Sequence, residues 1–140
     1  MGRAHTTNYV DTFIAVAHDC TASVGLVPSP RKTPSVAELT YAMIVDNPYR
    51  FTSDDVVFGV WAMRQGLAAE AWEAARTEFF AKGRACLRSS DLGKRYGWGV
   101  HADSQGRVAL YPVNSIEYLH FMSGADVVTV TRAMKSSRAK

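Results

Sequence analysis

The sequence lacks long hydrophobic runs and contains little cysteine. None of its apolar stretches approaches the roughly 20 residues that a membrane-spanning helix needs, and the polar residues 1–8 lack the hydrophobic part of a secretion signal. The two cysteines, Cys20 and Cys86, are too few for a disulfide framework and too far apart for a metal-binding knuckle. We therefore expect a cytoplasmic protein without membrane contact, and we predict neither a metal site nor a cofactor.

The composition that remains is that of an ordinary globular protein. Apolar residues make up 47% of the 140 residues and charged residues 21%, which excludes disorder throughout the chain. A chain of this length buries roughly two thirds of its unfolded surface when it folds, so it needs no disulfide bonds for stability. We predict a single domain over residues 1–140, with flexible ends at residues 1–7 and 134–140.

The first third of the chain predicts a strand, a loop and a helix. Residues 9–17 are rich in β-branched and aromatic types, which favours a strand. Residues 21–33 hold prolines, glycine and hydroxyl side chains, which are typical of a loop. A helix then begins at a capping residue, either Thr33 or Ser35, and ends at Asp46-Asn47-Pro48.

Two further helices are predicted in the middle of the chain. Residues 52–55 repeat the start signal, with hydroxyls followed by Asp54 and Asp55 at the positive end of a helix dipole. Residues 56–63 then favour a helix, although they are apolar enough for a buried strand. Residues 68–82 form a clearer helical pattern that ends at Gly83.

The last third of the chain predicts sheet. Residues 95–101 and 108–113 flank a turn at residues 103–106, the pattern of a β-hairpin. Ser115 can cap a short helix, and residues 126–133 alternate as a final strand does.

Helices grouped between strands indicate an α+β fold. With only one hairpin, the order of elements predicts a mostly antiparallel sheet of about four strands with three or four helices.

One segment, residues 82–101, has a composition that suggests chemistry. Residues 82–95 carry five basic residues against one acid, while the chain as a whole has a formal charge of +3. Arginine forks match phosphate or carboxylate groups, serines add short donors, and aromatic rings can stack a base. The segment therefore predicts a binding site for an anionic ligand: a nucleotide, a phosphorylated metabolite or single-stranded nucleic acid. The predicted ligand-binding residues are Arg84, Arg88, Ser89, Ser90, Lys94, Arg95, Tyr96 and Trp98. The alternative is a solvated basic loop.

Gly97 and Gly99 alternate with larger residues in the predicted strand of this segment. Glycine weakens a strand, so two on one face indicate that something approaches the backbone closely there. That group is either a ligand or, as we favour, a helix packed against the sheet.

Two other functions are open. Cys86, flanked by Arg84 and Arg88, could be a nucleophile with His101 as its base, as in a thiol-dependent enzyme. A buried structural cysteine is the alternative interpretation. In the third hypothesis, Trp61 and Trp72 contribute to a homodimer face, and the protein is an interaction module.

Several motifs are distributed along nearly the whole chain. They are His5-Thr6-Thr7-Asn8-Tyr9, Thr12-Phe13-Ile14, Asp46-Asn47-Pro48-Tyr49, Thr52-Ser53-Asp54-Asp55-Val56, Phe58, Cys86-Leu87-Arg88-Ser89-Ser90 and Lys94-Arg95-Tyr96-Gly97-Trp98-Gly99-Val100-His101. With these motifs the sequence resembles an uncharacterised family of short bacterial and fungal proteins, a domain of unknown function. The resemblance implies a single domain and favours a site shared by the polar motifs, but it implies no activity and no catalytic roles.

Overall fold

A four-stranded mixed sheet lies at the centre of the protein. The computed structural model describes residues 4–126 and 128–136. The strand order is β3-β2-β1-β4, in which β1 pairs with β2 antiparallel and β2 with β3 antiparallel, while β1 and β4 run parallel. The predicted α+β class with a mostly antiparallel sheet is therefore confirmed. The strands are β1 (Thr12–Ala15), β2 (Trp98–Ala102), β3 (Val108–Pro112) and β4 (Thr129–Arg132).

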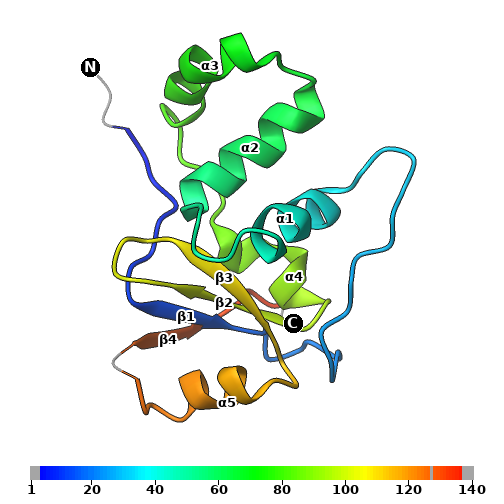
Figure 1. The fold of residues 1–140 in the computed structure, drawn as a ribbon, viewed down its shortest axis with the longest axis vertical. Helices are drawn as coiled ribbons and strands as arrows, with labels where there is room; N and C mark the ends of the chain where they lie inside the picture. Colours follow the sequence, from blue (N-terminus) through cyan, green and yellow to red (C-terminus); the bar gives the residue numbers. More distant parts are fainter. Residues whose placement is uncertain (1–3, 127, 137–140) are drawn as a thin grey trace.

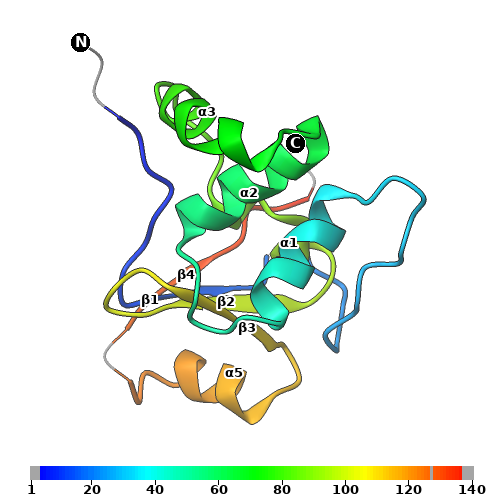
Figure 2. The same ribbon diagram turned by 45° about the horizontal axis from the view of Figure 1, so that its top comes forward.

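Helices cover both faces of this sheet (Figure 1 and Figure 2). The helices α1 to α4 lie over one face, and α5 alone lies under the other. Within the described residues there are five α-helices where the sequence predicts three or four. Their bounds are α1 (Val36–Val45), α2 (Ser53–Gln65), α3 (Trp72–Phe79), α4 (Asp91–Lys94) and α5 (Ile116–Met122), with short 3₁₀ turns η1 (Ala69–Ala71) and η2 (Leu87–Ser89).

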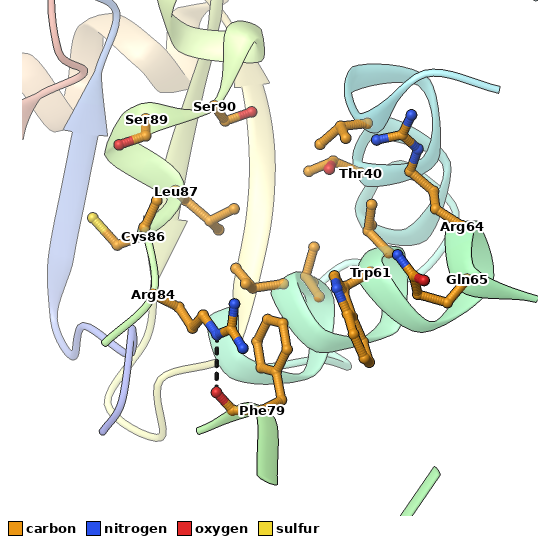
Figure 3. A pocket seen from close by; sticks show the side chains of 15 residues that line it. Thr40, Trp61, Arg64, Gln65, Phe79, Arg84, Cys86, Leu87, Ser89 and Ser90 are labelled. Atoms are coloured by element: carbon orange, nitrogen blue, oxygen red, sulfur yellow. Dashed lines mark hydrogen bonds between the residues drawn. The ribbon is translucent and has the colours of Figure 1, made fainter. Parts of the chain in front are cut away.

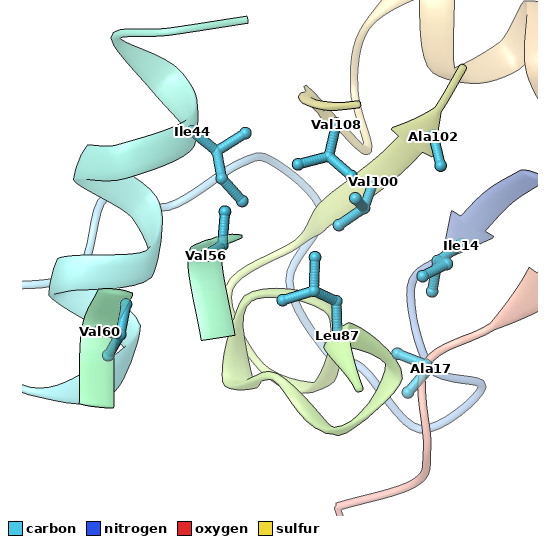
Figure 4. Close-up of a cluster of buried hydrophobic side chains, with 10 residues drawn as sticks. Ile14, Ala17, Ile44, Val56, Val60, Leu87, Val100, Ala102 and Val108 are labelled. Atoms are coloured by element: carbon cyan, nitrogen blue, oxygen red, sulfur yellow. The ribbon is translucent and has the colours of Figure 1, made fainter. Parts of the chain in front are cut away.

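Each face of the sheet has its own apolar core. On the α1 and α2 side, Ile14 and Val100 of the sheet meet Ile44, Val56 and Leu87 (Figure 4). The side chains between the sheet and α5 form a second cluster, made of Phe13, Ala15, Val16, Tyr118 and Phe121. Consecutive residues of β1 thus alternate between the two cores, as a strand requires.

The helix starts follow the capping signals of the sequence. Ser35, not Thr33, caps α1, because its Oγ accepts a hydrogen bond of 3.1 Å from the Glu38 amide. Thr52 and Asp55 form a capping box at the start of α2, in which each side chain accepts from the other residue's amide. Residues 56–63 are therefore helical, and the alternative of a buried strand is excluded.

The predicted hairpin is present, with its turn closed by Asp103 and Gly106. The Asp103 carboxylate accepts hydrogen bonds from the Gln105 and Arg107 amides, both at 2.9 Å. Gly106 has φ +77°, the left-handed conformation that glycine adopts without strain. The predicted cap of α5 is also confirmed, because the Ser115 Oγ accepts from the Tyr118 amide at 3.1 Å.

Several element boundaries differ from the sequence-based expectation, among them those of β2, predicted over 95–101, and of β4, predicted over 126–133. The first strand spans only Thr12–Ala15, within the predicted 9–17, because the sheet partners of β1 end there. The helix predicted over 68–82 is divided into η1 and α3 and ends at Phe79. The basic segment predicted as a loop contains η2 and α4, the latter capped by Ser90.

The structure describes part of each chain end that the sequence predicts to be flexible. Of the ends predicted to be flexible, residues 1–3 and 137–140 lie outside the described residues, whereas Thr6 and Thr7 are hydrogen-bonded to Asp54. In the described part of the chain, every helix is too short or too polar to cross a membrane.

Candidate functional site

A pocket of about 300 Å³ lies between α2 and residues 84–90, the segment that connects α3 to α4. Figure 3 shows α2 on one side of the pocket, the 84–90 segment on the other, and α1 behind the upper rim. The lining is mostly apolar. It consists of Val36, Thr40, Val56, Val57, Val60, Trp61, Arg64, Gln65, Phe79, Arg84, Ala85, Cys86, Leu87, Ser89 and Ser90.

The floor of the pocket is provided by one face of α2. Val57, Val60, Trp61 and Arg64 follow each other at helical spacing, so they share this face. The Trp61 ring is half-buried and packs at 5.0 Å from the Phe79 ring, measured between centroids. The floor therefore offers apolar and aromatic surface to a ligand.

Arg84 is the best-ordered cation of the pocket. Its Nε donates a hydrogen bond of 2.9 Å to the Phe79 carbonyl, and its guanidinium lies 3.9 Å from the centroid of the Phe79 ring. These two contacts fix the side chain and leave its terminal N–H groups for a ligand. A second hollow, which contains Glu78 and Lys82, lies against the same Phe79 and Arg84 side chains.

The pocket holds a second guanidinium and no acid among the residues that line it. Arg64 stands in the last turn of α2 and is followed in the chain by Gln65, and both side chains are exposed. Ser89, Ser90 and Thr40 contribute hydroxyl groups to the lining. Two cations without a lining carboxylate make the pocket electropositive, which favours an anion.

Cys86 lines the pocket, but its thiol is turned away from it (Figure 3). The Sγ atom lies 3.5 Å from the Tyr9 hydroxyl on the side of the N-terminal segment. This contact with Cys86, together with burial, raises the pKa of Tyr9, while the nearby charge of Arg88 opposes the shift. Cys86 and Tyr9 thus form a small polar contact behind the wall of the pocket.

His101 lies on the opposite face of the sheet from Cys86. Its ring stacks on Phe121 of α5 with centroids 4.4 Å apart, whereas Leu87, next to Cys86, packs into the core on the α2 side. The structure therefore does not bring together the two residues of the predicted thiol–imidazole pair. The physical reason is the alternation of β2, in which neighbouring residues point to opposite faces.

His101 instead belongs to a hydrogen-bonded group with two tyrosines. The Tyr49 hydroxyl lies 2.8 Å from His101 Nδ1 and 2.8 Å from the Tyr111 hydroxyl. Burial lowers the pKa of His101, against the opposing charges of nearby carboxylates, and favours the neutral ring. Burial and the bond to Tyr111 raise the pKa of Tyr49 well above its ordinary value, so this phenol stays protonated.

Of the eight predicted ligand-binding residues, the pocket brings together Arg84, Ser89 and Ser90. Arg88 is adjacent, but its Nε donates to the Arg132 carbonyl at 2.7 Å and ties η2 to the end of β4. Lys94 is half-buried in α4 and outside the pocket lining. Arg95 is exposed and 4.0 Å from the Asp91 carboxylate.

The two predicted aromatic residues hold the loop at residues 21–33. Trp98 is 9% exposed, and its Nε1 donates to the Leu26 carbonyl at 2.8 Å. The Tyr96 carbonyl accepts from the Leu26 amide at 2.8 Å, and the Tyr96 side chain is half-buried. Neither residue lines the pocket.

The chain itself makes the close approaches that the glycines of this segment predict. A Cβ on Gly99 would lie 2.4 Å from Phe13 Cζ and 2.9 Å from Tyr118 Cε2. Gly97 has φ +80°, and a Cβ there would lie 2.5 Å from the Val24 carbonyl oxygen. Packing of α5 and of the 21–33 loop, rather than a ligand, accounts for both glycines.

The acidic pair at the start of α2 has structural partners. The Asp54 carboxylate accepts from the Thr7 amide at 2.6 Å and from the hydroxyls of Thr6 and Thr7 at 2.7 Å. Asp55 bonds Arg76 at 2.8 Å and closes the capping box. In residues 4–126 and 128–136, no group of three or more His, Cys, Asp or Glu side chains is arranged to hold a metal ion.

The residues that sequence reasoning missed are the polar ones of α2, Arg64 and Gln65. A signal for them existed, because Val57, Trp61 and Arg64 lie on one helical face at spacings of four and three. Sequence alone did not show that this face opposes residues 84–90.

Comparison with known proteins identifies the family but no activity. A family model described as "Family of unknown function (DUF6157)" matches residues 4–139. No curated protein and no solved structure matches the chain. The resemblance of the sequence to an uncharacterised domain family is thus confirmed at that level, and the chain belongs to the DUF6157 family.

Proposed function

We propose that the protein binds a small anionic ligand with an apolar body in the pocket between α2 and residues 84–90. The observation that carries this proposal is Arg84. Its guanidinium is held against Phe79 by a stacking contact and a hydrogen bond, at the edge of a largely apolar pocket without a lining acid. A cation that is already ordered loses little side-chain entropy when it binds an anion.

The rest of the pocket defines the other half of the ligand. Val57, Val60 and Trp61 present apolar surface, and burying such surface contributes about 25 cal/mol per Å². A fully polar anion would gain nothing from this floor, and an uncharged apolar molecule would leave the guanidinium without a partner. An amphiphilic anion satisfies both parts of the pocket.

The placement of the other basic residues favours a small ligand over single-stranded nucleic acid. Nucleic acid of that kind needs a continuous track of cations with exposed aromatic rings. Here Arg88 is engaged by the Arg132 carbonyl, Arg95 lies outside the pocket lining, and Trp98 is buried under Leu26. Of the basic residues in the 82–95 segment, Arg84 lines the pocket, and Arg64 of α2 joins it there, which makes a local site rather than a track.

Octanoate is a suitable probe because it joins a carboxylate to a short apolar chain. In isothermal titration calorimetry we expect octanoate to bind, and 1-octanol to bind more weakly because it lacks the charge. Arg84→Gln should weaken octanoate binding at least about tenfold, or about 1.4 kcal/mol, since charge-assisted hydrogen bonds are lost. Arg107→Gln, an exposed arginine outside the pocket, serves as the matched control and should leave the affinity unchanged.

Two results would contradict the proposal. One is that octanoate does not bind at all. The other is that Arg84→Gln and Arg107→Gln have equal effects, which would place the bound anion elsewhere.

A thiol-dependent enzyme receives less support from the same geometry. The Cys86 thiol points away from the pocket toward Tyr9, and His101 lies across the sheet. A nucleophile needs its base within hydrogen-bond reach, which this arrangement does not provide.

A further inference from the structure

The pocket has a guanidinium at each of two separated positions. Figure 3 shows Arg84 on the 84–90 segment and, across the pocket, Arg64 on α2, whose guanidinium extends toward α1 near Thr40. Both side chains line the pocket. An anion bound to Arg84 therefore leaves the second cation, Arg64, for another group of the ligand.

Among the residues that the structure describes, Arg64 has no hydrogen-bond or ion-pair partner. The described residues give its guanidinium no hydrogen bond and no ion pair, in contrast to Arg76 of α3, which bonds Asp55 at 2.8 Å. A basic residue in the last turn of a helix complements the helix dipole. The helix dipole therefore explains why a cation stands at this position. It does not explain why the side chain of this cation lines the pocket, where another cation is already present.

Apolar surface separates the two cations. Val57, Val60 and Trp61 occupy the face of α2 that leads to Arg64. At the helical rise, the distance along the axis from Val57 to Arg64 is about 10 Å, which is comparable to a carbon chain of moderate length. The order of chemistry along the pocket is thus cation, apolar floor, cation.

From this order we infer that the ligand is anionic at both ends: an α,ω-dicarboxylate, or a molecule with the same two-ended charge. One carboxylate pairs with Arg84, the carbon chain lies on Val57, Val60 and Trp61, and the other carboxylate pairs with Arg64 beside Gln65. This inference rests on the proposed function and specifies its ligand class. A planar guanidinium suits both ends, because it matches a carboxylate with two parallel hydrogen bonds.

The experiment compares octanedioate with octanoate by calorimetry on the intact protein. We expect octanedioate to bind at least about tenfold more tightly, since the second carboxylate adds a charge-assisted contact. Arg64→Gln should remove most of this advantage while changing octanoate affinity much less. Arg107→Gln should preserve it. A length series from succinate to dodecanedioate should show an optimum at an intermediate chain, because only one range of lengths reaches both cations.

The outcomes separate this inference from the proposed function. If octanoate and octanedioate bind equally, or if affinity rises steadily with chain length without an optimum, the two-ended ligand is wrong and the amphiphilic anion remains. If Arg64→Gln weakens both ligands alike, Arg64 does not distinguish the second carboxylate, and the inference also fails. If neither ligand binds, both proposals fail. Urea unfolding of Arg64→Gln, expected to match the unmodified protein within about 0.5 kcal/mol as for a surface residue, excludes a folding defect as the cause.

Discussion

Gly99 of β2 lies against side chains of both β1 and α5. The Phe13 and Tyr118 rings fill the space that a side chain at position 99 would need. The same two rings pack edge to face with centroids 5.1 Å apart, and the Tyr118 hydroxyl accepts from the Val16 amide at 3.0 Å. The glycine therefore permits an aromatic layer that anchors α5 to the sheet.

We predict that Gly99→Ala lowers the free energy of unfolding by about 2 kcal/mol, the scale of overpacking in a closed core. Neither ring can move without disturbing its neighbours in the cluster. Gly83→Ala is the matched control, because Gly83 is exposed and its added Cβ would meet nothing closer than His5 Nδ1 at 3.8 Å. Urea unfolding measures both variants, and equal stabilities would show that the aromatic layer adapts.

The backbone of Tyr49 is strained. It has φ +59°, a left-handed backbone that a bulky residue rarely adopts. Its hydroxyl bonds to His101 and Tyr111, and its amide donates to the Val108 carbonyl at 2.9 Å, which holds the residue against β3. These contacts offset the strain and connect the α1–α2 turn to the sheet.

At the scale of elements, α2 contributes both to the core and to the pocket. Its buried face contacts the core through Val56 and Val60, and its half-exposed face forms the floor of the pocket. Its first turn is closed by Thr52 and Asp55, and Gly66 ends it in the left-handed conformation at φ +68°. The pocket depends on this helix, because its apolar floor and Arg64 stand on consecutive turns.

The capping box of α2 predicts a pH dependence. Burial alone would raise the pKa of Asp55, but hydrogen bonds from Thr52 and Arg76 outweigh it and lower the pKa. The charged form is therefore favoured in the folded state. Its stabilisation is present above the ordinary pKa of an aspartate, near pH 4, and is lost as the pH falls through the lowered pKa.

Asp55→Asn should consequently destabilise the protein by about 1 kcal/mol at pH 7, the usual scale of a lost cap, and by less at pH 3. Urea unfolding at the two pH values measures the difference. Asp46→Asn, exposed at the end of α1, is the control. A loss from Asp55→Asn that is equal at both pH values would show that the carboxylate charge contributes nothing.

For the molecule as a whole, the N-terminal segment connects three parts of the fold. The Asp54 amide donates to Asn8 Oδ1 at 2.8 Å while the Asp54 carboxylate accepts from Thr7. The His5 amide donates to the Phe80 carbonyl at 2.8 Å, and Tyr9 contacts Cys86 behind the pocket wall. The polar motif near the start of the chain and the one at the start of α2 are thus hydrogen-bonded to each other.

Removal of residues 1–8 should lower the free energy of unfolding by at least about 2 kcal/mol, since hydrogen bonds to a charged carboxylate are among the stronger ones. Asp54→Ala should also be destabilising in the full chain and cost much less in the shortened chain, because both changes remove the bonds of Thr6 and Thr7 to the Asp54 carboxylate. Urea unfolding of the four proteins completes the cycle. Additive losses would mean that Asp54 and the segment act independently.

The sequence by itself determined most of the elements, because their signals are local, but it did not predict η2 and α4. Caps at Ser35, Thr52 and Ser115 and the turn at Asp103 act between residues that are near neighbours in the chain, so their pattern predicts helices and a hairpin. It also predicted a candidate site in the basic segment, and Arg84 of that segment lines the pocket.

Only the tertiary structure decided which residues meet across distance. The parallel pairing of β4 with β1, the position of Arg64 opposite Arg84, and the separation of Cys86 from His101 all depend on contacts between remote parts of the chain. A shift of one residue along a strand exchanges the two faces of a sheet, and local sequence signals do not specify such a register by themselves. Most of the elements were therefore predictable, whereas the pocket depends on how they pack.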